Sequence, residues 1–165
     1  MPVDPAYANK QARIKTRLGE MVVKFFPEVA PGHVKNFIDL AKKGFYNGVI
    51  FHRVINNFMI QGGCPEGTGR GGPGYTIKDE VQGNDKKHFK GALSMAKTAA
   101  PNTAGSQFFI MHGKHAKHLD GVHTVFGELV SGMDTLDKIA TVKVGAGDRP
   151  VEPVKMESVT IEDAS

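Results

Sequence analysis

The sequence predicts a mainly β fold, an antiparallel barrel or sandwich with helices over its open ends. Most apolar runs are four to six residues long and are bounded by Gly, Pro or Asn, which is typical of short strands. Only two stretches repeat apolar residues at helical spacing, so alternating βαβ units are not expected. Because 40% of the 165 residues are apolar, the chain can bury one core without a metal or disulfide.

The first expected element is an antiparallel hairpin, with strands over residues 13–18 and 21–26 and a turn at Gly19-Glu20. A helix is expected from Pro31 to Lys43, since apolar residues recur there at i, i+3, i+4 and i+7 and a glycine follows. The same spacing predicts a second helix between Gly132 and Thr141. The other strands are expected over residues 49–54, 58–61, 92–96, 107–111, 125–130 and 154–161.

Length and charge indicate one domain over residues 1–165, with 1–10 as a flexible N-terminal extension. Lys and Arg number 21 and Asp and Glu 17, and the basic residues are scattered, so neither nucleic acid nor a membrane is an expected partner. Cys64 is the single cysteine, which excludes an internal disulfide and fits a reducing compartment. No apolar stretch suits a signal peptide or a membrane span, so we expect a cytoplasmic protein. We also expect it to be a monomer.

Two motifs have to be weighed as ligand sites. Residues 67–72 satisfy G-x-G-x-x-G, but Pro73-Gly74 follows and breaks the helix that a dinucleotide site needs, so a surface loop is favoured. His112, His115 and His118 lie at spacings of three, which leaves a zinc or nickel site open as the alternative to a solvated loop. We expect no metal and no cofactor, because the intervening lysines repel a cation.

The segment 51–55 places one polar group oddly among apolar ones. Strand alternation puts Arg53 on the face opposite His52 and Val54, with Phe51 and Ile55 beside it. We expect His52 to be a structural histidine with its hydrogen bonds satisfied. An arginine between large apolar residues either pairs with a carboxylate or serves a site.

The segment 107–111 is apolar on both faces. Phe108 and Ile110 can enter the core, while Gln107, Phe109 and Met111 face the other way. That second face is too apolar for open solvent, so it is covered by a helix or belongs to a binding site.

Five blocks of the sequence resemble the signature segments of the cyclophilins; they are residues 51–55, 58–63, 93–96, 101–110 and 119–127. The resemblance extends more loosely from Arg13 to Ile161, and residues 64–77 resemble bacterial members. It implies an eight-stranded antiparallel β-barrel capped by two α-helices. It also implies a peptidyl-prolyl cis–trans isomerase that acts on proline-containing peptides and on unfolded or folding proteins, with a chaperone-like role in protein folding.

By position, the resemblance makes Arg53 the catalytic residue. The residues that it assigns to the substrate groove are Phe58, Met59, Gln61, Ala96, Lys97, Thr98, Gln107, Phe109, His118, Leu119 and His123. Since rotation about an X-Pro bond removes no proton, His123 is expected to be a groove wall and hydrogen-bond donor rather than a base. Cys64 is expected to be inert. A prolyl-peptide adaptor and a metal protein that depends on His112 and His115 are the alternative functions.

Two departures from the family pattern affect the expected groove. Lys97 and Thr98 stand where many members have Asn and Ala, and the chain there is one residue longer than common versions. His118 stands where many eukaryotic members have a tryptophan that binds cyclosporin. We therefore expect isomerase activity to be retained and cyclosporin binding to be weakened.

Overall fold

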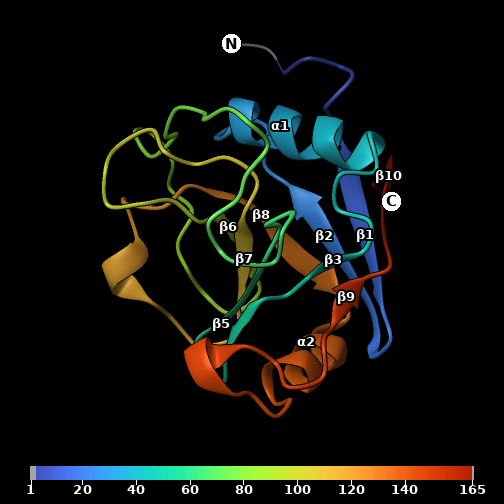
Figure 1. Cartoon of the computed structure of the whole chain (residues 1–165). Helices are drawn as coiled ribbons and strands as arrows, with labels where there is room; N and C mark the ends of the chain where they lie inside the picture. The colour runs from blue at the N-terminus through green and yellow to red at the C-terminus, as the bar shows by residue number, and fades with distance from the viewer. Residues whose placement is uncertain (1–2, 165) are drawn as a thin grey trace.

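The computed structural model describes residues 3–164, and its centre is one antiparallel sheet of eight strands curled into a half-barrel. Two helices lie at opposite ends of the sheet, α1 (Pro31–Lys42) and α2 (Met133–Ala140) (Figure 1). This arrangement confirms the predicted fold class. The strands follow the order β10 (Ser158–Asp163), β1 (Lys10–Thr16), β2 (Gly19–Phe25), β8 (Val125–Ser131), β6 (Ala92–Met95), β7 (Phe108–Met111), β5 (Met59–Gly62) and β4 (Arg53–Ile55).

The predicted hairpin is β1 and β2, but its turn lies two residues earlier than expected. Thr16 pairs with Gly19, so Arg17 and Leu18 form the turn. The Thr16 hydroxyl accepts the Leu18 N–H and donates to the Gly19 carbonyl, which closes the turn at that point. Gly19 therefore belongs to β2.

Helix α1 begins at Pro31, as predicted, although Ala30 before it offers no side-chain cap. The carboxylate of Glu80 caps it instead, accepting the N–H groups of Gly32 and His33 at 3.0 and 2.7 Å. Glu80 lies 47 positions after His33 in a long loop, so these hydrogen bonds also hold that loop against α1.

The main core fills the space between the sheet and the two helices. Its centre is aromatic: the Phe108 ring meets Phe37, Tyr46 and Phe51 edge-on at 5.3, 5.4 and 6.3 Å. A second, smaller cluster lies on the other face of the same strands, and its buried members are Met59, Ala92, Phe109, Met111, Ala116 and Val125. The alternation predicted for residues 107–111 is confirmed, since Phe108 and Ile110 belong to the main core.

The strand predicted over residues 49–54 is split in two. Its first part, β3 (Val49–Ile50), leaves the large sheet and pairs with β9 (Lys155–Met156), while Arg53 begins β4. Phe51 lies between them, where its N–H donates to the Val154 carbonyl and its side chain is fully buried in the main core. The expectation that Phe51 stands beside Arg53 is therefore wrong, because the break in the strand ends the alternation.

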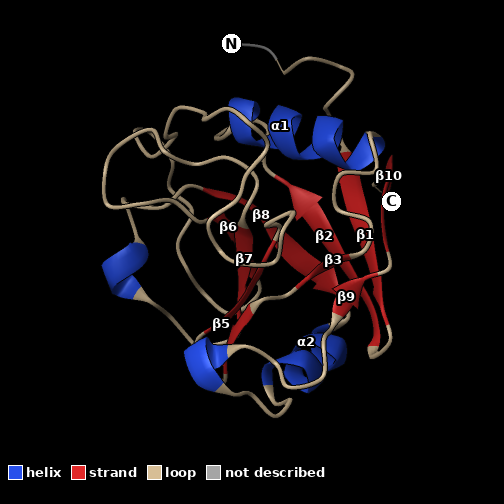
Figure 2. Ribbon diagram, viewed as in Figure 1, coloured by secondary structure: helices blue, strands red, loops and turns tan. Residues whose placement is uncertain are grey.

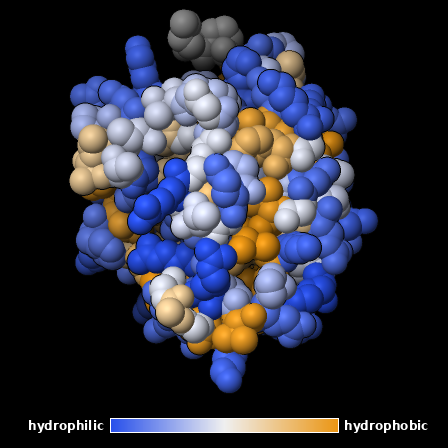
Figure 3. Space-filling view, in the orientation of Figure 1, coloured by the Kyte–Doolittle hydropathy of each residue, from blue (hydrophilic) through white to orange (hydrophobic). Residues whose placement is uncertain are grey.

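Long loops gather on one side of the molecule, at the left of Figure 2. They meet the sheet at Gly63, whose φ is +94° and where a Cβ would lie 2.4 Å from the Ser106 carbonyl oxygen, so only glycine fits. The face in Figure 3 is mostly hydrophilic, with hydrophobic side chains emerging near its centre and lower end.

Part of the predicted N-terminal extension, Met1 and Pro2, lies outside the described residues. Further along it, the Tyr7 hydroxyl donates to Asp39 of α1 at 2.9 Å, and Lys10 begins β1. Within residues 3–164, no helix combines the length and apolar character of a membrane span.

Candidate active site

Two adjoining cavities open between the loops and the outer face of the sheet. The smaller, of about 240 Å³, is lined by Arg53, Phe58, Met59, Gln61, Ala96, Lys97, Phe109, Leu119 and His123. The larger, of about 520 Å³, shares Gln61, Ala96 and Lys97 with it and adds Thr98, Gln107 and the Gly-rich loop. Eleven of the twelve residues that the sequence assigns to the site therefore lie on one of these cavities or on both, with Thr98 and Gln107 on the larger only.

Strand register explains why residues so far apart in the sequence meet here. Arg53 of β4 pairs with Gln61 of β5, Gln61 pairs with Phe109 of β7, and Phe109 pairs with Ser94 of β6. Directly paired residues project from the same face of a sheet, so these four form one row across four strands. Arg53, Gln61 and Phe109 of this row line the smaller cavity, while Ser94 is buried behind it.

Arg53 provides the positive charge of the smaller cavity. Its side chain is exposed, and it has no hydrogen bond or ion pair to any residue between 3 and 164. Among these residues, Arg53 therefore does not form the ion pair with a carboxylate that was the alternative to a role in a site. Its five N–H donors are available to a ligand.

The rest of the smaller cavity is largely apolar. Phe58 and Leu119 are half-buried and pack on the second cluster, while Met59 and Phe109 are buried within it. Leu119 comes from a short 3-10 helix, η1 (Lys117–Leu119), and the others come from β5, β7 and the turn before β5. Such a lining favours a compact apolar group of a ligand.

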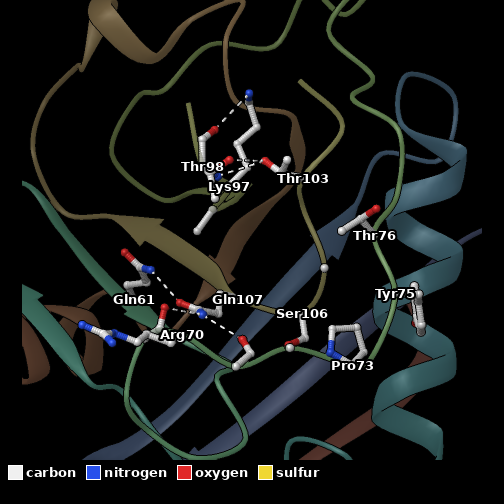
Figure 4. A pocket seen from close by; sticks show the side chains of 15 residues that line it. Gln61, Arg70, Pro73, Tyr75, Thr76, Lys97, Thr98, Thr103, Ser106 and Gln107 are labelled. Atoms are coloured by element: carbon white, nitrogen blue, oxygen red, sulfur yellow. Dashed lines mark hydrogen bonds between the residues drawn. The ribbon is translucent and has the colours of Figure 1, made fainter. Parts of the chain in front are cut away.

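Gln61 and Gln107 connect the two cavities through a chain of amides. The side-chain amide of Gln61 donates to the side-chain oxygen of Gln107 at 3.0 Å. The side-chain amide of Gln107 in turn donates to the backbone carbonyls of Gly69 and Gly71, each at 2.9 Å (Figure 4). The amide nitrogen of Gln107 is therefore committed to the Gly-rich loop. That loop contributes Arg70, Pro73 and neighbouring residues to the larger cavity, a role that the G-x-G-x-x-G pattern indicated only as a surface loop.

Lys97 lines both cavities with its stem while its ammonium points away from the two glutamines (Figure 4). The ammonium donates to the carbonyls of Thr98 and Ala100 and lies 3.7 Å from the Asp79 carboxylate. Thr98 is tied to Thr103 by its N–H and its hydroxyl. These contacts stiffen the segment in which the chain departs from the cyclophilin pattern.

His123 and His118 occupy different positions at the groove. The Nδ1 of His123 lies 2.9 Å from the Met95 carbonyl, and burial lowers the pKa of its ring, so it donates to that carbonyl as a neutral side chain at neutral pH. His118 is exposed, lines neither cavity and packs its ring 6.0 Å from that of Phe58. It stands at the rim, outside the apolar lining.

The other two histidines of the predicted cluster turn to separate partners. His112 accepts the Asn57 N–H and contacts Asp137 at 3.0 Å, while His115 contacts Asp120 at 2.7 Å. Across residues 3–164, no group of three or more His, Cys, Asp or Glu side chains is arranged to hold a metal ion.

His52 and Cys64 lie beneath the Gly-rich loop. His52 is buried but its Nδ1 has no hydrogen-bond partner within the described residues, so the expectation of a fully satisfied histidine is wrong. Burial and then the charges of Arg149 and Arg53 lower the pKa of its ring. Burial opposes ionisation of Cys64, but the N–H groups of Gly71 and Gly69 on its sulfur prevail and lower its pKa.

Comparison with known proteins identifies the family. Residues 11–161 match the family model "Cyclophilin type peptidyl-prolyl cis-trans isomerase/CLD". Peptidyl-prolyl cis-trans isomerase B of Bacillus subtilis is 60% identical over 111 residues, which are 67% of this chain and 76% of that protein. A peptidyl-prolyl cis-trans isomerase of Helicobacter pylori is 54% identical over 130 residues, 78% of each chain.

A solved structure is similar over nearly the whole chain. The cyclophilin-type peptidyl-prolyl cis-trans isomerase of Cryptosporidium parvum, crystallised in the presence of the dipeptide Ala-Pro, has a TM-score of 0.88 and 35% identity. The match covers 93% of this chain and 99% of that one. The match of fold, the span of the family model and the similarity to bacterial relatives together establish that this chain belongs to the cyclophilin-type peptidyl-prolyl cis–trans isomerases, a family of enzymes.

Proposed function

We propose that the chain accelerates rotation about X-Pro bonds without covalent chemistry, with Arg53 stabilising the twisted imide beside an apolar pocket for the proline ring. The observation that carries this proposal is the position of Arg53, an exposed guanidinium without a protein partner in residues 3–164, on a cavity otherwise lined by Phe58, Met59, Phe109 and Leu119. A positive donor and an apolar socket are the two features that this reaction needs.

Rotation is slow because twisting the bond breaks amide resonance, which presents a barrier of about 18–20 kcal/mol. As the bond leaves planarity, the prolyl nitrogen becomes pyramidal and its electron pair localises. A fixed donor aimed at that nitrogen therefore binds the twisted state better than either planar isomer, and this difference lowers the barrier. The guanidinium suits the role because it stays charged and its N–H groups are rigidly arranged.

The apolar lining would hold the proline ring while the rest of the peptide turns. Gln61 lies beside Arg53 across the β4–β5 pair and can bind the peptide backbone. The amide nitrogen of Gln107 is held by the Gly-rich loop, and its side-chain oxygen accepts the Gln61 N–H and so orients Gln61. His123 serves as a wall, since its pKa is lowered and the reaction moves no proton. Ala96, Lys97 and Thr98 would bound the path of the peptide into the larger cavity.

Proline-containing peptides and folding proteins are the substrates that we propose. The similar Cryptosporidium parvum structure in the presence of Ala-Pro supports a prolyl peptide as ligand. Because prolyl isomerisation can limit folding, a general folding helper is the cellular role that follows. The single cysteine fits a reducing compartment such as the cytoplasm.

Exchange spectroscopy on one X-Pro peptide tests the proposal. Arg53→Ala should lower kcat/KM about 100-fold, the range for loss of one transition-state donor, while the melting temperature stays near that of the unaltered chain. Arg17→Ala is the matched control, since Arg17 is an arginine of the β1–β2 turn that contacts the Glu152 and Pro153 carbonyls and lines neither cavity. If Arg53→Ala keeps full turnover, the mechanism is refuted. Peptide capture without any catalysed exchange would indicate an adaptor.

A further inference from the structure

Behind the smaller cavity lies a chain of hydrogen bonds, buried at His88 and Ser94, that the mechanism above does not use. His88 is fully buried, with its Nδ1 2.9 Å from Asp120 and its Nε2 2.8 Å from the Ser94 hydroxyl. The second oxygen of Asp120 lies 2.7 Å from Nε2 of His115. The chain therefore connects β6, the loop before it and the segment after η1.

This chain supports the cavity wall directly. The His88 ring stacks on Phe109, with centroids 5.9 Å apart and planes inclined by 17°, and meets His123 edge-on at 6.4 Å. Asp120 directly follows Leu119 in the chain, and Ser94 is the fourth member of the row that begins at Arg53. Phe109 and His123 therefore contact His88, and Leu119 is joined to Asp120 by a peptide bond.

The protonation state of His88 fixes the direction of the hydrogen bonds. Asp120 accepts the backbone N–H of His88 at 2.7 Å as well as the ring, so it acts as an ionised acceptor and His88 Nδ1 donates to it. In the neutral ring, Nε2 must then accept the single Ser94 hydroxyl proton. When the ring is protonated, Nε2 becomes a donor, and the Ser94 proton is released to the Thr124 carbonyl 3.2 Å away.

That reversal reaches the groove by a short route. Thr124 follows His123 in the chain, and its carbonyl already accepts the Met95 N–H at 3.1 Å. Met95 in turn offers the carbonyl that His123 binds. Protonation of His88 therefore changes both the charge behind Phe109 and the hydrogen bonds on either side of His123.

We propose that His88 is a positioning residue, which in its neutral state holds Phe109, Leu119 and His123 in the arrangement that grips the proline ring and on protonation loosens that grip. The proposal rests on the isomerase function proposed above and adds to it a dependence on pH. No sequence pattern marks His88, Ser94 or Asp120 for this role.

The charged and titratable groups around His88 are few. Asp120 faces it from the segment after η1, His115 from the loop before η1 and His123 from the segment before β8, while β6 and β7 present only Ser94 and Phe109. Burial, partly offset by Asp120, lowers the pKa of His88, so the ring is neutral at pH 7. Loosening is thus expected only at a pH below the ordinary pKa of a histidine side chain.

Helix α1 provides a matched control. His33 is also buried and lies 2.7 Å from a carboxylate, that of Glu80, but it packs on Phe126 of the main core and lines neither cavity. Replacing His33 removes a comparable histidine–carboxylate pair without touching the groove wall.

The test measures kcat and KM from pH 5 to pH 8 for the unaltered chain and for His88→Phe, Asp120→Asn, Ser94→Ala and His33→Phe. His88→Phe keeps an aromatic ring behind Phe109 but cannot titrate; we expect a fall of about fivefold in kcat/KM at pH 7.5, mainly through KM, and loss of the decline at acid pH. Asp120→Asn removes the charge that favours protonated His88, so the decline should move to lower pH. His33→Phe should keep the original profile.

NMR titration of the histidine rings separates this proposal from the function itself. The signals of Phe109 and His123 should shift with the pKa of His88 in the free protein, and in Ser94→Ala this coupling should weaken even if His88→Phe does not fold. An acid decline that persists in His88→Phe, or that follows the titration of His123 alone, overturns the positioning role. Full turnover in Arg53→Ala would instead refute the proposed mechanism and leave the NMR result standing.

Discussion

The two faces of β7 separate the main core from the candidate site. Phe108 and Phe109 are neighbours in the chain and both are buried, but Phe108 is enclosed by three aromatic rings of the main core. Phe109 rests on His88 and His123, and beyond them it lines an open cavity of about 240 Å³. Because side chains alternate along a strand, successive residues of one short segment face the main core and the candidate site in turn.

The two faces differ in how much apolar surface remains open to a ligand. In the main core, packing consumes that surface, and each buried side chain stabilises the fold by about 1.5–3 kcal/mol. On the outer face, Phe58 and Leu119 stay half-buried, so a ligand can complete their burial. Substitutions on the two faces should therefore have separable effects.

The largest expected effect is on the inner face. Phe108→Ala should lower the free energy of unfolding by about 3–5 kcal/mol, because it opens a cavity among rings that cannot collapse into it. Denaturant unfolding measures this loss, and kcat/KM per folded molecule should stay close to that of the unaltered chain. Phe108→Leu is the milder variant if the alanine chain does not fold. Reduced turnover in a fully folded Phe108→Leu would contradict the division between the faces.

The next effect concerns the support behind the outer face. Burial opposes ionisation of Asp120, but hydrogen bonds from His88 and His115 prevail and lower its pKa to about 2. A depressed carboxyl pKa contributes stability above the unfolded value of 3.8, and this stability is lost as pH falls through the folded value. From pH 5 to pH 2, the unaltered chain should lose about 2 kcal/mol more than Asp120→Asn does.

Urea unfolding at several pH values measures that loss. Asp85→Asn is the control, since Asp85 is exposed and has no ion pair within residues 3–164. Parallel pH profiles for Asp120→Asn and the unaltered chain would show that the carboxylate contributes no such stability.

On the outer face itself, Leu119→Ala should raise KM about tenfold, corresponding to about 1.4 kcal/mol of apolar contact with the proline ring. The melting temperature should change little, since Leu119 is already half open to solvent. Val151→Ala, at an exposed valine that lines neither cavity, is the control for loss of apolar surface. An unchanged KM would remove Leu119 from the ligand site.

An effect of comparable size is expected at the rim. His118→Trp should increase affinity for cyclosporin about tenfold, because a larger aromatic ring beside Phe58 adds contact area, and should leave prolyl turnover unchanged. Calorimetric titration of both chains checks the gain. Equal affinities would show that another position, such as the segment around Lys97, governs the binding of this ligand.

Sequence patterns predicted the elements whose information is local. The hairpin, α1 and the alternation of Phe108 and Phe109 follow from spacing within a few residues, and the resemblance added the set of cavity residues. The error at Phe51 arose because nothing in residues 49–55 signals that β3 leaves the large sheet for β9, more than 100 positions away.

Local sequence patterns could not predict the contacts between polar residues that are far apart in the chain. Glu80 caps α1 from 47 positions away, and His88 meets Asp120 across 32. Each is an ordinary polar residue of a loop, and only the fold brings the partners together. Nor does any local pattern show that Nδ1 of His52 has no hydrogen-bond partner among residues 3–164, since this depends on the loop that folds over it.

Gly63 limits how such a groove can change over generations. A single added carbon there would collide with the backbone at Ser106, and the residues on either side lead to Gln61 and to the Gly-rich loop. Divergence at the proposed binding surface must therefore proceed through exchangeable side chains around this fixed junction, such as those of Arg70, Lys97 and His118. New specificities can arise in this family by substitution of side chains at the rim, while the backbone contact between Gly63 and Ser106 is retained.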